Sequence, residues 1–454
     1  MRQSYARIAS QKDSTLKFID LGLEGPLLSA LEALGHDTPT PIQVKAIPTI
    51  LDGRDVVGLA QTGTGKTGAF SLPLLQRLAA TSKGSPAPKM VRALVLSPTR
   101  ELAAQIHQSV RDYSKGQKLH SMCVFGGVSI RPQITSAARG VDVMIATPGR
   151  LLDLIEQKAV RLDQVETLIL DEADQMLDIG FLPAIRRIFN MVPKKRQTLL
   201  FSATMPKEIR KLAADHLNQP VEIAVTPAAT PVEKIDQSVM LLASGSKPAA
   251  VAHLARQSPG KRVIVFTRTK RGADRVVKSL DQAGLAAAAI HGNKSQNNRV
   301  RALAAFKDGS CPILIATDIA ARGIDVPGVE LVINYDLPNV PEVYVHRIGR
   351  TARAGASGLA VSLVSGEDRG LLRDIERLIK RQIEVVAPPV GLPVASAVEE
   401  PRREPQQQRR QPQQNKARTG AGAGHGAKTA DKKPGRPSRR RRNRGGGKPQ
   451  AKAA

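Results

Sequence analysis

The sequence predicts an α/β protein: two tandem, doubly wound parallel-sheet domains followed by a disordered basic tail. Three observations support this prediction. The chain has 454 residues, short apolar runs alternate with amphipathic stretches, and the composition changes twice along the chain. This length exceeds one ordinary hydrophobic core, so two domains with extra segments are expected. Apolar residues make up 41% of the chain, which is enough for two packed cores.

Short apolar runs in each half predict the strands. The runs of the first half are Val56–Leu59, Ala93–Leu96, Val143–Ala146 and Leu168–Leu170. Those of the second half are Val263–Phe266, Ile313–Ala316, Leu331–Ile333 and Leu359–Leu363. Continuous apolar runs are typical of strands buried on both faces of a parallel sheet. Helical stretches such as 101–113 and 272–283 lie between them, and this alternation predicts doubly wound domains.

The domain limits follow from changes in composition. The stretch from Pro220 to Asp236 has three prolines, which indicates a linker. After Val386 the chain becomes rich in Gln, Arg, Gly and Lys and can bury little, so it should be disordered in isolation. We therefore expect a short N-terminal extension at 1–17, a first domain at 18–222, a linker at 223–236, a second domain at 237–386 and a tail at 387–454.

The charge distribution favours a polyanionic partner. The net charge is +28, and residues 401–454 hold 17 Lys and Arg against two acids. A basic tail on a moderately basic body favours nucleic acid, although a charge run that only aids solubility remains an alternative for the tail. Aromatic residues make up 3% of the chain and Trp is absent, so stacking cannot dominate ligand binding.

The cysteines and the N-terminus indicate a location. Cys123 and Cys311 lie far apart without a partner motif, which excludes a disulfide framework and a cysteine zinc site and fits a reducing cytosol. The N-terminus has no apolar core of signal-peptide length, and no run of about 18 apolar residues occurs. We expect a cytoplasmic protein without a membrane partner.

A phosphate-binding loop follows the strand that ends at Leu59. Glycines there let successive backbone N–H groups face a phosphate chain at a helix N-terminus. Lys66 is placed to reach the β and γ phosphates, and the Thr67 hydroxyl to coordinate Mg²⁺. Ala60 stands where the usual pattern has Gly. The predicted loop comprises Ala60, Gln61, Thr62, Gly63, Thr64, Gly65, Lys66 and Thr67.

Two acids follow the strand that ends at Leu170. Asp171 is predicted to hold Mg²⁺, and Glu172 to orient or deprotonate the attacking water. Adjacent acids at a strand end are often only a solvated turn. The phosphate loop upstream favours the catalytic interpretation.

These residues belong to an ordered set of motifs that resembles the DEAD-box ATP-dependent RNA helicases. The acidic box is Asp171-Glu172-Ala173-Asp174, and the resemblance covers about 18–385. Phe18, Gly35 and 39–43 resemble the family's Q motif, within 16–44. HGNKSQ at 291–296 resembles the bacterial RhlE-like subgroup. The other matching segments are 98–103, 126–127, 147–150, 202–204, 265–269, 296–299, 316–325 and 346–353.

The resemblance implies two RecA-like domains and a role for each matched residue. Phe18 and Gln43 would bind adenine, and Asp325 the ribose. Arg350 and Arg353 would be arginine fingers, joining Lys66, Asp171 and Glu172 in catalysis; a helical segment would place both on one face. The residues implied in coupling are Asp174, Ser202, Thr204 and His346. Those implied in RNA binding are Pro98, Thr99, Arg100, Gly127, Thr147, Pro148, Arg150, Arg268, Arg299 and Thr317.

Three positions depart from the family pattern: Ala352 replaces a glycine, Gln175 follows the acidic box where Arg or Lys is common, and His36 follows Gly35. None removes a reacting group. The implied protein is an RNA-stimulated ATPase that unwinds short RNA duplexes or remodels RNA–protein complexes without reading sequence. It could act as a monomer, and ribosomal particles or RNA-decay proteins are compatible partners.

Three alternatives to an RNA helicase remain. An ATP-dependent RNA clamp or chaperone in ribosome assembly or RNA turnover would show the same motifs. A DNA helicase on the same plan is disfavoured by the Q motif and the acidic box. A scaffold without catalysis is disfavoured because Lys66, Glu172, Arg350 and Arg353 are all present.

Overall fold

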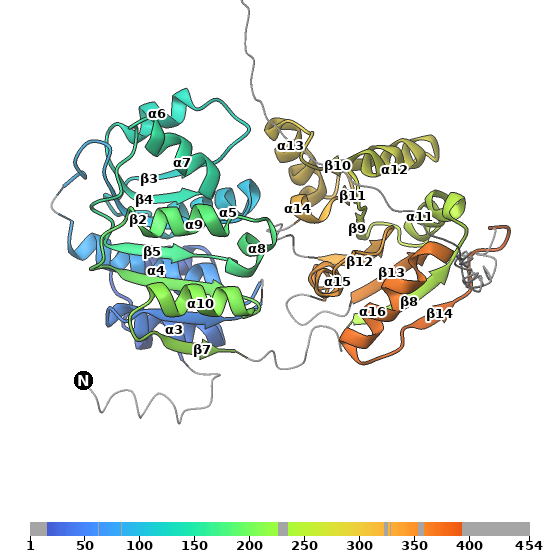
Figure 1. Ribbon diagram of the computed structural model, residues 1–454, viewed down its shortest axis with the longest axis horizontal. Helices are drawn as coiled ribbons and strands as arrows, with labels where there is room; N and C mark the ends of the chain where they lie inside the picture. Colours follow the sequence, from blue (N-terminus) through green and yellow to red (C-terminus); the bar gives the residue numbers. More distant parts are fainter. Residues whose placement is uncertain are drawn as a thin grey trace, which may run out of the picture. The chain divides into compact units, whose positions relative to one another are not determined.

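The structure is a computed structural model that describes residues 16–61, 63–82, 84–225, 235–321, 326, 328–352 and 358–392. Within these ranges strands and helices alternate and form two sheets of seven strands each (Figure 1). All pairings between neighbouring strands are parallel. The predicted α/β class with two parallel-sheet domains is confirmed.

The first sheet has the strand order β3-β4-β2-β5-β6-β1-β7. Its central strands are buried along their whole length, as expected for a sheet covered on both faces. Gly58 is required inside the sheet, because a Cβ there would lie 2.5 Å from the Phe201 ring. The strands are β1 (Val56–Leu59), β2 (Val91–Leu96), β3 (Ser121–Val124), β4 (Val141–Ala146), β5 (Thr167–Leu170), β6 (Gln197–Ser202) and β7 (Val221–Ala224).

Two apolar cores lie on opposite faces of this sheet. One is built with α3, α4 and α5, and the other with α7, α8, α9 and α10. The helices of this domain are η1 (Phe18–Leu21), α2 (Pro26–Ala33), α3 (Pro41–Leu51), α4 (Lys66–Ala80), α5 (Arg100–Tyr113), α6 (Arg131–Ala137), α7 (Pro148–Glu156), α8 (Ala173–Asp178), α9 (Leu182–Phe189) and α10 (Lys207–His216).

The second sheet has the order β10-β11-β9-β12-β13-β8-β14, which repeats the order of the first. Its strands are β8 (Ile235–Leu241), β9 (Arg262–Phe266), β10 (Ala287–Ile290), β11 (Ile313–Ala316), β12 (Val329–Asn334), β13 (Gly358–Val364) and β14 (Glu384–Val386). Three apolar clusters pack against this sheet. Its helices are η3 (Ser244–Ser246), α11 (Lys247–Arg256), α12 (Lys270–Gln282), α13 (Gln296–Asp308), α14 (Asp318–Ala321), α15 (Pro341–Ile348), η5 (Gly366–Asp368) and α16 (Arg369–Ile379).

The ends of the strands refine the limits drawn from composition. β7 continues to Ala224 and β8 begins at Ile235, so each strand includes two residues of the predicted linker 223–236. β14 ends at Val386, the predicted end of the second domain. The predicted extension at 1–15 and the tail from 393 lie outside the described residues. No described helix has the length and apolar character needed to cross a membrane.

Candidate functional site

Most of the candidate residues of the first domain lie at the carboxyl edge of its sheet. Because all seven strands are parallel, their carboxyl ends meet at one edge, which is where open α/β sheets bind ligands. The phosphate loop follows β1, the acidic pair follows β5 and Ser202 ends β6. Thr99 and Thr147 follow β2 and β4. The fold thus gathers motifs that are as far apart in the chain as Ala60 and Ser202.

The phosphate loop runs from Ala60 into α4. Gly65 caps the helix in the left-handed conformation (φ 93°), and a Cβ there would lie 2.7 Å from the Thr40 Oγ1 atom. The Thr64 hydroxyl donates to the Gln61 carbonyl at 2.7 Å, which closes the loop. Lys66 is 5% exposed, and its Nζ atom has no hydrogen-bond partner among the described residues. Thr62, also predicted for this loop, lies outside them.

The acidic pair is buried and strained. Asp171 and Glu172 are both about 2% exposed, and Glu172 adopts a left-handed conformation with φ 54°. Such conformations are rare outside glycine and cluster at functional sites. Burial raises the pKa of Asp171 to about 7; the charge of Lys66 opposes that shift, whereas Glu172 and Asp174 reinforce it. A cation beside this carboxyl group would favour its ionised form.

The three coupling candidates of the first domain form one hydrogen-bonded unit. The Asp174 Oδ2 atom accepts from both the backbone N–H and the hydroxyl of Thr204, each at 2.9 Å. The backbone N–H of Asp174 donates to the Ser202 hydroxyl at 3.2 Å. The segment after β5 is therefore tied by hydrogen bonds to the segment after β6.

Gln43 links the start of α3 to the phosphate loop. Its Oε1 atom accepts from the Thr40 backbone N–H at 2.8 Å, and its Nε2 atom donates to the Gly65 carbonyl at 3.1 Å. A side-chain amide has two lone pairs and two protons, so one of each remains for a ligand. Phe18 is buried in the core beside this segment. The ring centroids of His36 and Tyr113 lie 6.4 Å apart.

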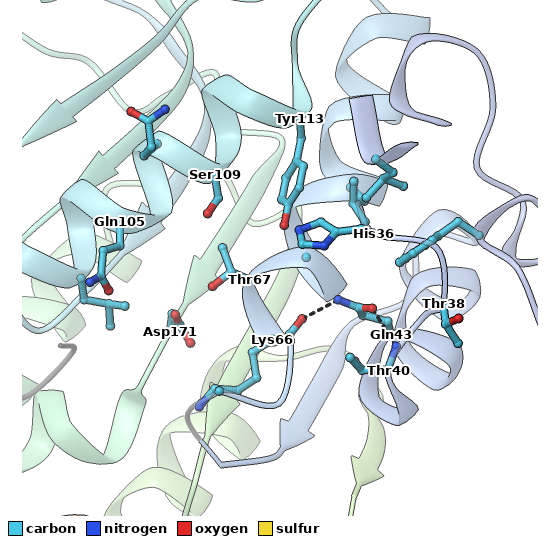
Figure 2. A pocket seen from close by; sticks show the side chains of 18 of the residues that line it. His36, Thr38, Thr40, Gln43, Lys66, Thr67, Gln105, Ser109, Tyr113 and Asp171 are labelled. Atoms are coloured by element: carbon cyan, nitrogen blue, oxygen red, sulfur yellow. Dashed lines mark hydrogen bonds between the residues drawn. The ribbon is translucent and has the colours of Figure 1, made fainter. Parts of the chain in front are cut away.

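These residues line one pocket of about 460 Å³, a size suited to a nucleotide. Figure 2 shows Gln43, Lys66, Thr67 and Asp171 around it, with His36 and Tyr113 toward one end. α5 forms a further wall that the motifs did not predict. The pocket therefore combines a phosphate loop, hard oxygen donors and an aromatic end.

The basic candidates of the first domain are also brought together. Gly127 (φ 79°) makes room for Arg100, because a Cβ at 127 would collide with the Arg100 guanidinium group. Arg150 donates to the Val128 carbonyl at 3.0 Å, from the first turn of α7. Thr99 caps α5 by accepting from the Leu102 N–H at 3.2 Å. Thr147 is the N-cap of α7, and Pro148 is its first residue.

In the second domain, Arg268 and Thr317 follow neighbouring strands, and Arg299 lies on α13. The backbone N–H of Arg268 donates to Asp336 Oδ2 at 2.9 Å, and its guanidinium group donates to the Leu337 carbonyl at 3.1 Å. The Thr317 carbonyl accepts from the N–H groups of Ala320 and Ala321 and so starts α14.

Arg347 is a residue of this domain that the motif analysis did not single out. It is 2% exposed, and its guanidinium group binds both carboxylate oxygens of Asp318, at 2.5 and 2.8 Å. It also donates to the Asn334 side chain and to the Asp336 carbonyl. His346 and Arg350 flank it, so Arg347 anchors their segment to the start of α14. Its place between those two residues was the only signal in the sequence.

The helix predicted to present Arg350 and Arg353 together ends too early. α15 ends at Ile348, and Ala352 adopts a left-handed conformation with φ 55°. Arg350 therefore lies beyond the end of the helix on which the prediction depended. The Thr351 hydroxyl instead clamps this turn by donating to the Val329 carbonyl at 2.6 Å. Arg353 and Asp325 lie outside the described residues.

Family models match most of both domains. The model for DEAD/DEAH box helicases matches residues 40–212, and the one for the helicase conserved C-terminal domain matches residues 246–355. The two matches include the phosphate loop, the acidic pair, Arg347 and Arg350.

Curated proteins with similar sequences are named as RNA helicases. DEAD-box ATP-dependent RNA helicase 46 of Arabidopsis thaliana is 43% identical over 83% of this chain, which spans 58% of that protein. RNA helicase CrhR of Synechocystis is 42% identical over 83% of this chain and 75% of its own length. DEAD-box ATP-dependent RNA helicase CshA of Geobacillus kaustophilus is 42% identical over 82% of this chain and 78% of its own length.

Solved structures show the same fold. Yeast Dbp5 bound to RNA and ADP BeF3 matches with a TM-score of 0.71 and 31% identity, over 82% of this chain and 95% of that one. Mss116p bound to ssRNA and AMP-PNP matches with a TM-score of 0.73 and 30% identity, over 83% of this chain and 80% of that one. With its motifs, its fold and relatives of this similarity, the chain belongs to the DEAD-box ATP-dependent RNA helicases.

Proposed function

We propose that this chain uses ATP to bind RNA through its sugar–phosphate backbone and to separate short duplexes locally. One observation carries the proposal: the phosphate loop, the acidic pair and the Asp174–Ser202–Thr204 unit lie on one sheet edge. Arg100 and Arg150 follow other strands of that edge. A single rigid sheet thus carries both a nucleotide pocket and a basic surface.

Lys66 and the N–H groups of the phosphate loop would bind the ATP phosphates. Thr67 and Asp171 would hold Mg²⁺. A hydroxyl and a carboxylate oxygen are ligands that this ion accepts, and the raised pKa of Asp171 is the change that a cation would reverse. Within the described residues no group of three or more His, Cys, Asp or Glu is suited to a metal ion, so the phosphates would supply further ligands. When bound, Mg²⁺ supplies charge neutralisation on the phosphate oxygens.

Glu172 would orient the attacking water, from the backbone position that its left-handed conformation gives it. Arg350 and Arg353 would stabilise the charge that develops on the transferred phosphoryl group. Gln43 would contact adenine with the proton and lone pair that it has left, beside Phe18, and Asp325 would contact the ribose. Ala60, Gln61, Thr62, Gly63, Thr64 and Gly65 would complete the phosphate cradle.

RNA would be held by groups that recognise phosphates and 2′-hydroxyls without reading bases. In the first domain these are Pro98, Thr99, Arg100, Gly127, Thr147, Pro148 and Arg150. In the second domain they are Arg268, Arg299 and Thr317. Mss116p and Dbp5 have been solved with RNA and a nucleotide analogue, which supports this proposal. Asp174, Ser202, Thr204 and His346 would couple the two ligands.

Several finer predictions from the sequence also remain proposals. They are remodelling of RNA–protein complexes, ribosomal particles or RNA-decay proteins as partners, a monomeric state and a cytoplasmic location. The RhlE-like subgroup depends on HGNKSQ at 291–296, whereas the bacterial relatives described above are named CshA and CrhR.

Deletion of residues 401–454 should weaken RNA binding and its salt dependence and leave the ATPase largely intact.

The decisive experiment is steady-state ATP hydrolysis with no nucleic acid, with RNA and with duplex DNA. We expect strong stimulation by RNA alone and loss of activity in Glu172→Gln. Equal stimulation by DNA, or none by either, would contradict the proposed substrate. An RNA-duplex release assay then separates a helicase from an RNA clamp, because a clamp would hydrolyse ATP without releasing the strand.

A further inference from the structure

One face of α5 lines the nucleotide pocket over most of the helix length. Leu102, Gln105, Ser109 and Tyr113 follow one another at spacings of three, four and four residues, which places them on one face. All four line the pocket. In Figure 2 the side chain of Gln105 points toward the part of the pocket where Thr67 and Asp171 lie, and Tyr113 lies toward His36.

The amide of Gln105 is a buried donor whose hydrogen bonds are not satisfied by the protein. Its Nε2 atom is buried and has no hydrogen-bond partner among the described residues. Five other glutamines of this domain donate a hydrogen bond from that atom: Gln43, Gln76, Gln108, Gln133 and Gln197. Buried polar groups in folded proteins are almost always paired, so an unpaired donor facing a pocket indicates an acceptor that the ligand brings.

A second unpaired donor in the same pocket indicates the chemistry of that acceptor. The Nζ atom of Lys66 is also buried and has no hydrogen-bond partner in the described part of the chain, at the end where phosphates would bind. An amide N–H and an ammonium group beside Thr67 and Asp171 suit phosphate oxygens and the water bound to them.

We infer that Gln105 contacts the phosphate end of the bound nucleotide, donating a hydrogen bond from Nε2 to a phosphate oxygen or to a water bound there. This inference rests on the proposed use of ATP. Gln105 is about 7–8 Å along the axis from Arg100, at 1.5 Å per residue. The helix that begins at a proposed RNA contact therefore also carries a nucleotide contact.

Gln105→Met tests the inference, because methionine keeps the length of the side chain and removes the donor. We expect Mg²⁺-AMP-PNP to bind about tenfold more weakly, the loss typical of a hydrogen bond to a charged group. Adenosine, which lacks phosphates, should bind the variant and the wild type equally. Gln105→Glu should weaken AMP-PNP binding further, because its carboxylate would face the phosphates. Isothermal titration calorimetry on the full chain measures all three.

The matched control is Gln157→Met, an exposed glutamine at the end of α7, which should bind both ligands as the wild type does. Without ligand, Gln105→Met should melt at the temperature of the wild type, and only its stabilisation by Mg²⁺-AMP-PNP should shrink. Equal AMP-PNP affinity, or a lowered melting temperature without ligand, would overturn the inference and leave the proposed function standing. A wild-type chain that binds no Mg²⁺-AMP-PNP would overturn both.

Discussion

The two domains share one topology, but the lysines at equivalent positions differ in their hydrogen bonding. In each sheet the first strand in the chain leads through a short loop to a helix whose first residue is a buried lysine: Lys66 in α4 and Lys247 in α11. The Lys66 Nζ atom has no hydrogen-bond partner among the described residues. The Lys247 Nζ atom donates to Asp368 at 2.7 Å and to the Tyr335 carbonyl at 3.1 Å.

The loops before these lysines differ as well. Gly63 and Gly65 are left-handed, with φ of 86° and 93°, so the backbone curls and leaves N–H groups facing outward. In the second domain η3 closes a tight turn, in which the Ser246 N–H donates to the Ala243 carbonyl at 2.8 Å. A phosphate site thus requires hydrogen-bond donors without a partner in the protein. In the second domain, Lys247 and the Ser246 N–H already donate to protein acceptors. The shared fold does not supply the site.

The largest effect should come from Lys247→Met, which removes the nearest cation from the buried Asp368 and leaves Arg268, at 3.4 Å, and Ser365 as its partners. Removing one partner of a buried ion pair typically costs about 3–5 kcal/mol, and because Arg268 remains we expect about 3 kcal/mol. We expect the second domain to lose that much stability and nucleotide affinity to stay unchanged. Chemical denaturation combined with hydrogen exchange of peptides from β8 to β14 measures the loss by domain. Unchanged stability of the second domain together with weaker nucleotide binding would contradict the structural role of Lys247.

Lys66→Met should have the opposite pattern: it should lower ATP hydrolysis without lowering the stability of the fold. Its ammonium group has no hydrogen bond to lose among the residues that the structure describes, so the free energy of unfolding should stay constant or rise slightly. Removing one donor to the transition-state charge should lower kcat about 10²–10³-fold. Steady-state hydrolysis and a melting curve without ligand test both parts. A large loss of stability would mean that Lys66 is structural, as Lys247 is.

The sequence reveals one of these lysines and not the other, for a physical reason. Lys66 belongs to a local pattern of glycines between a strand and a helix, so the eight residues of the loop are enough to predict its role. Lys247 is satisfied by Asp368, 121 positions away, and Arg347 by Asp318, 29 positions away. Only tertiary packing reveals such partners.

The apolar runs predicted the fold because buried parallel strands have a local signature. Six strands escaped that analysis: β3, β6, β7, β8, β10 and β14. Five of them are short or only partly buried, and the buried β6 has polar residues at both ends, Gln197, Thr198 and Ser202. Candidate site residues could be named from the sequence where a motif is contiguous, as at the phosphate loop. The sequence did not indicate Gln105, whose unpaired amide depends on how α5 packs, or the end of α15 at Ile348.

A smaller effect should appear with pH. The pKa of Asp368 is lowered: burial raises it, but hydrogen bonds from Lys247 and Ser365 outweigh burial. A carboxyl group with a lowered pKa stabilises the fold above its unfolded pKa, about 3.9 for Asp, and that contribution is lost as pH falls through the folded value. The stability gap between wild type and Lys247→Met should therefore narrow below about pH 4. Denaturation midpoints at several pH values measure it; a constant gap would mean that the pair contributes through packing alone.

The smallest effect concerns strain beside the catalytic groups, where the domains are alike. Glu172 and Ala352 are both left-handed, with φ of 54° and 55°. Alanine there costs about 1 kcal/mol relative to glycine, so Ala352→Gly should raise the unfolding free energy by roughly that amount. Lys380→Gly is the matched control, since Lys380 has the same φ of 55° at the end of α16, away from the motifs.

Both glycine variants should gain stability, measured by denaturation of the full chain. Only Ala352→Gly should also change RNA-stimulated hydrolysis, because its turn carries Arg350, which Thr351 clamps to Val329. If Ala352→Gly changed hydrolysis no more than Lys380→Gly does, the strain at residue 352 would affect only the stability of the fold. The departure of this chain from the family's glycine would then have no consequence for how Arg350 is presented.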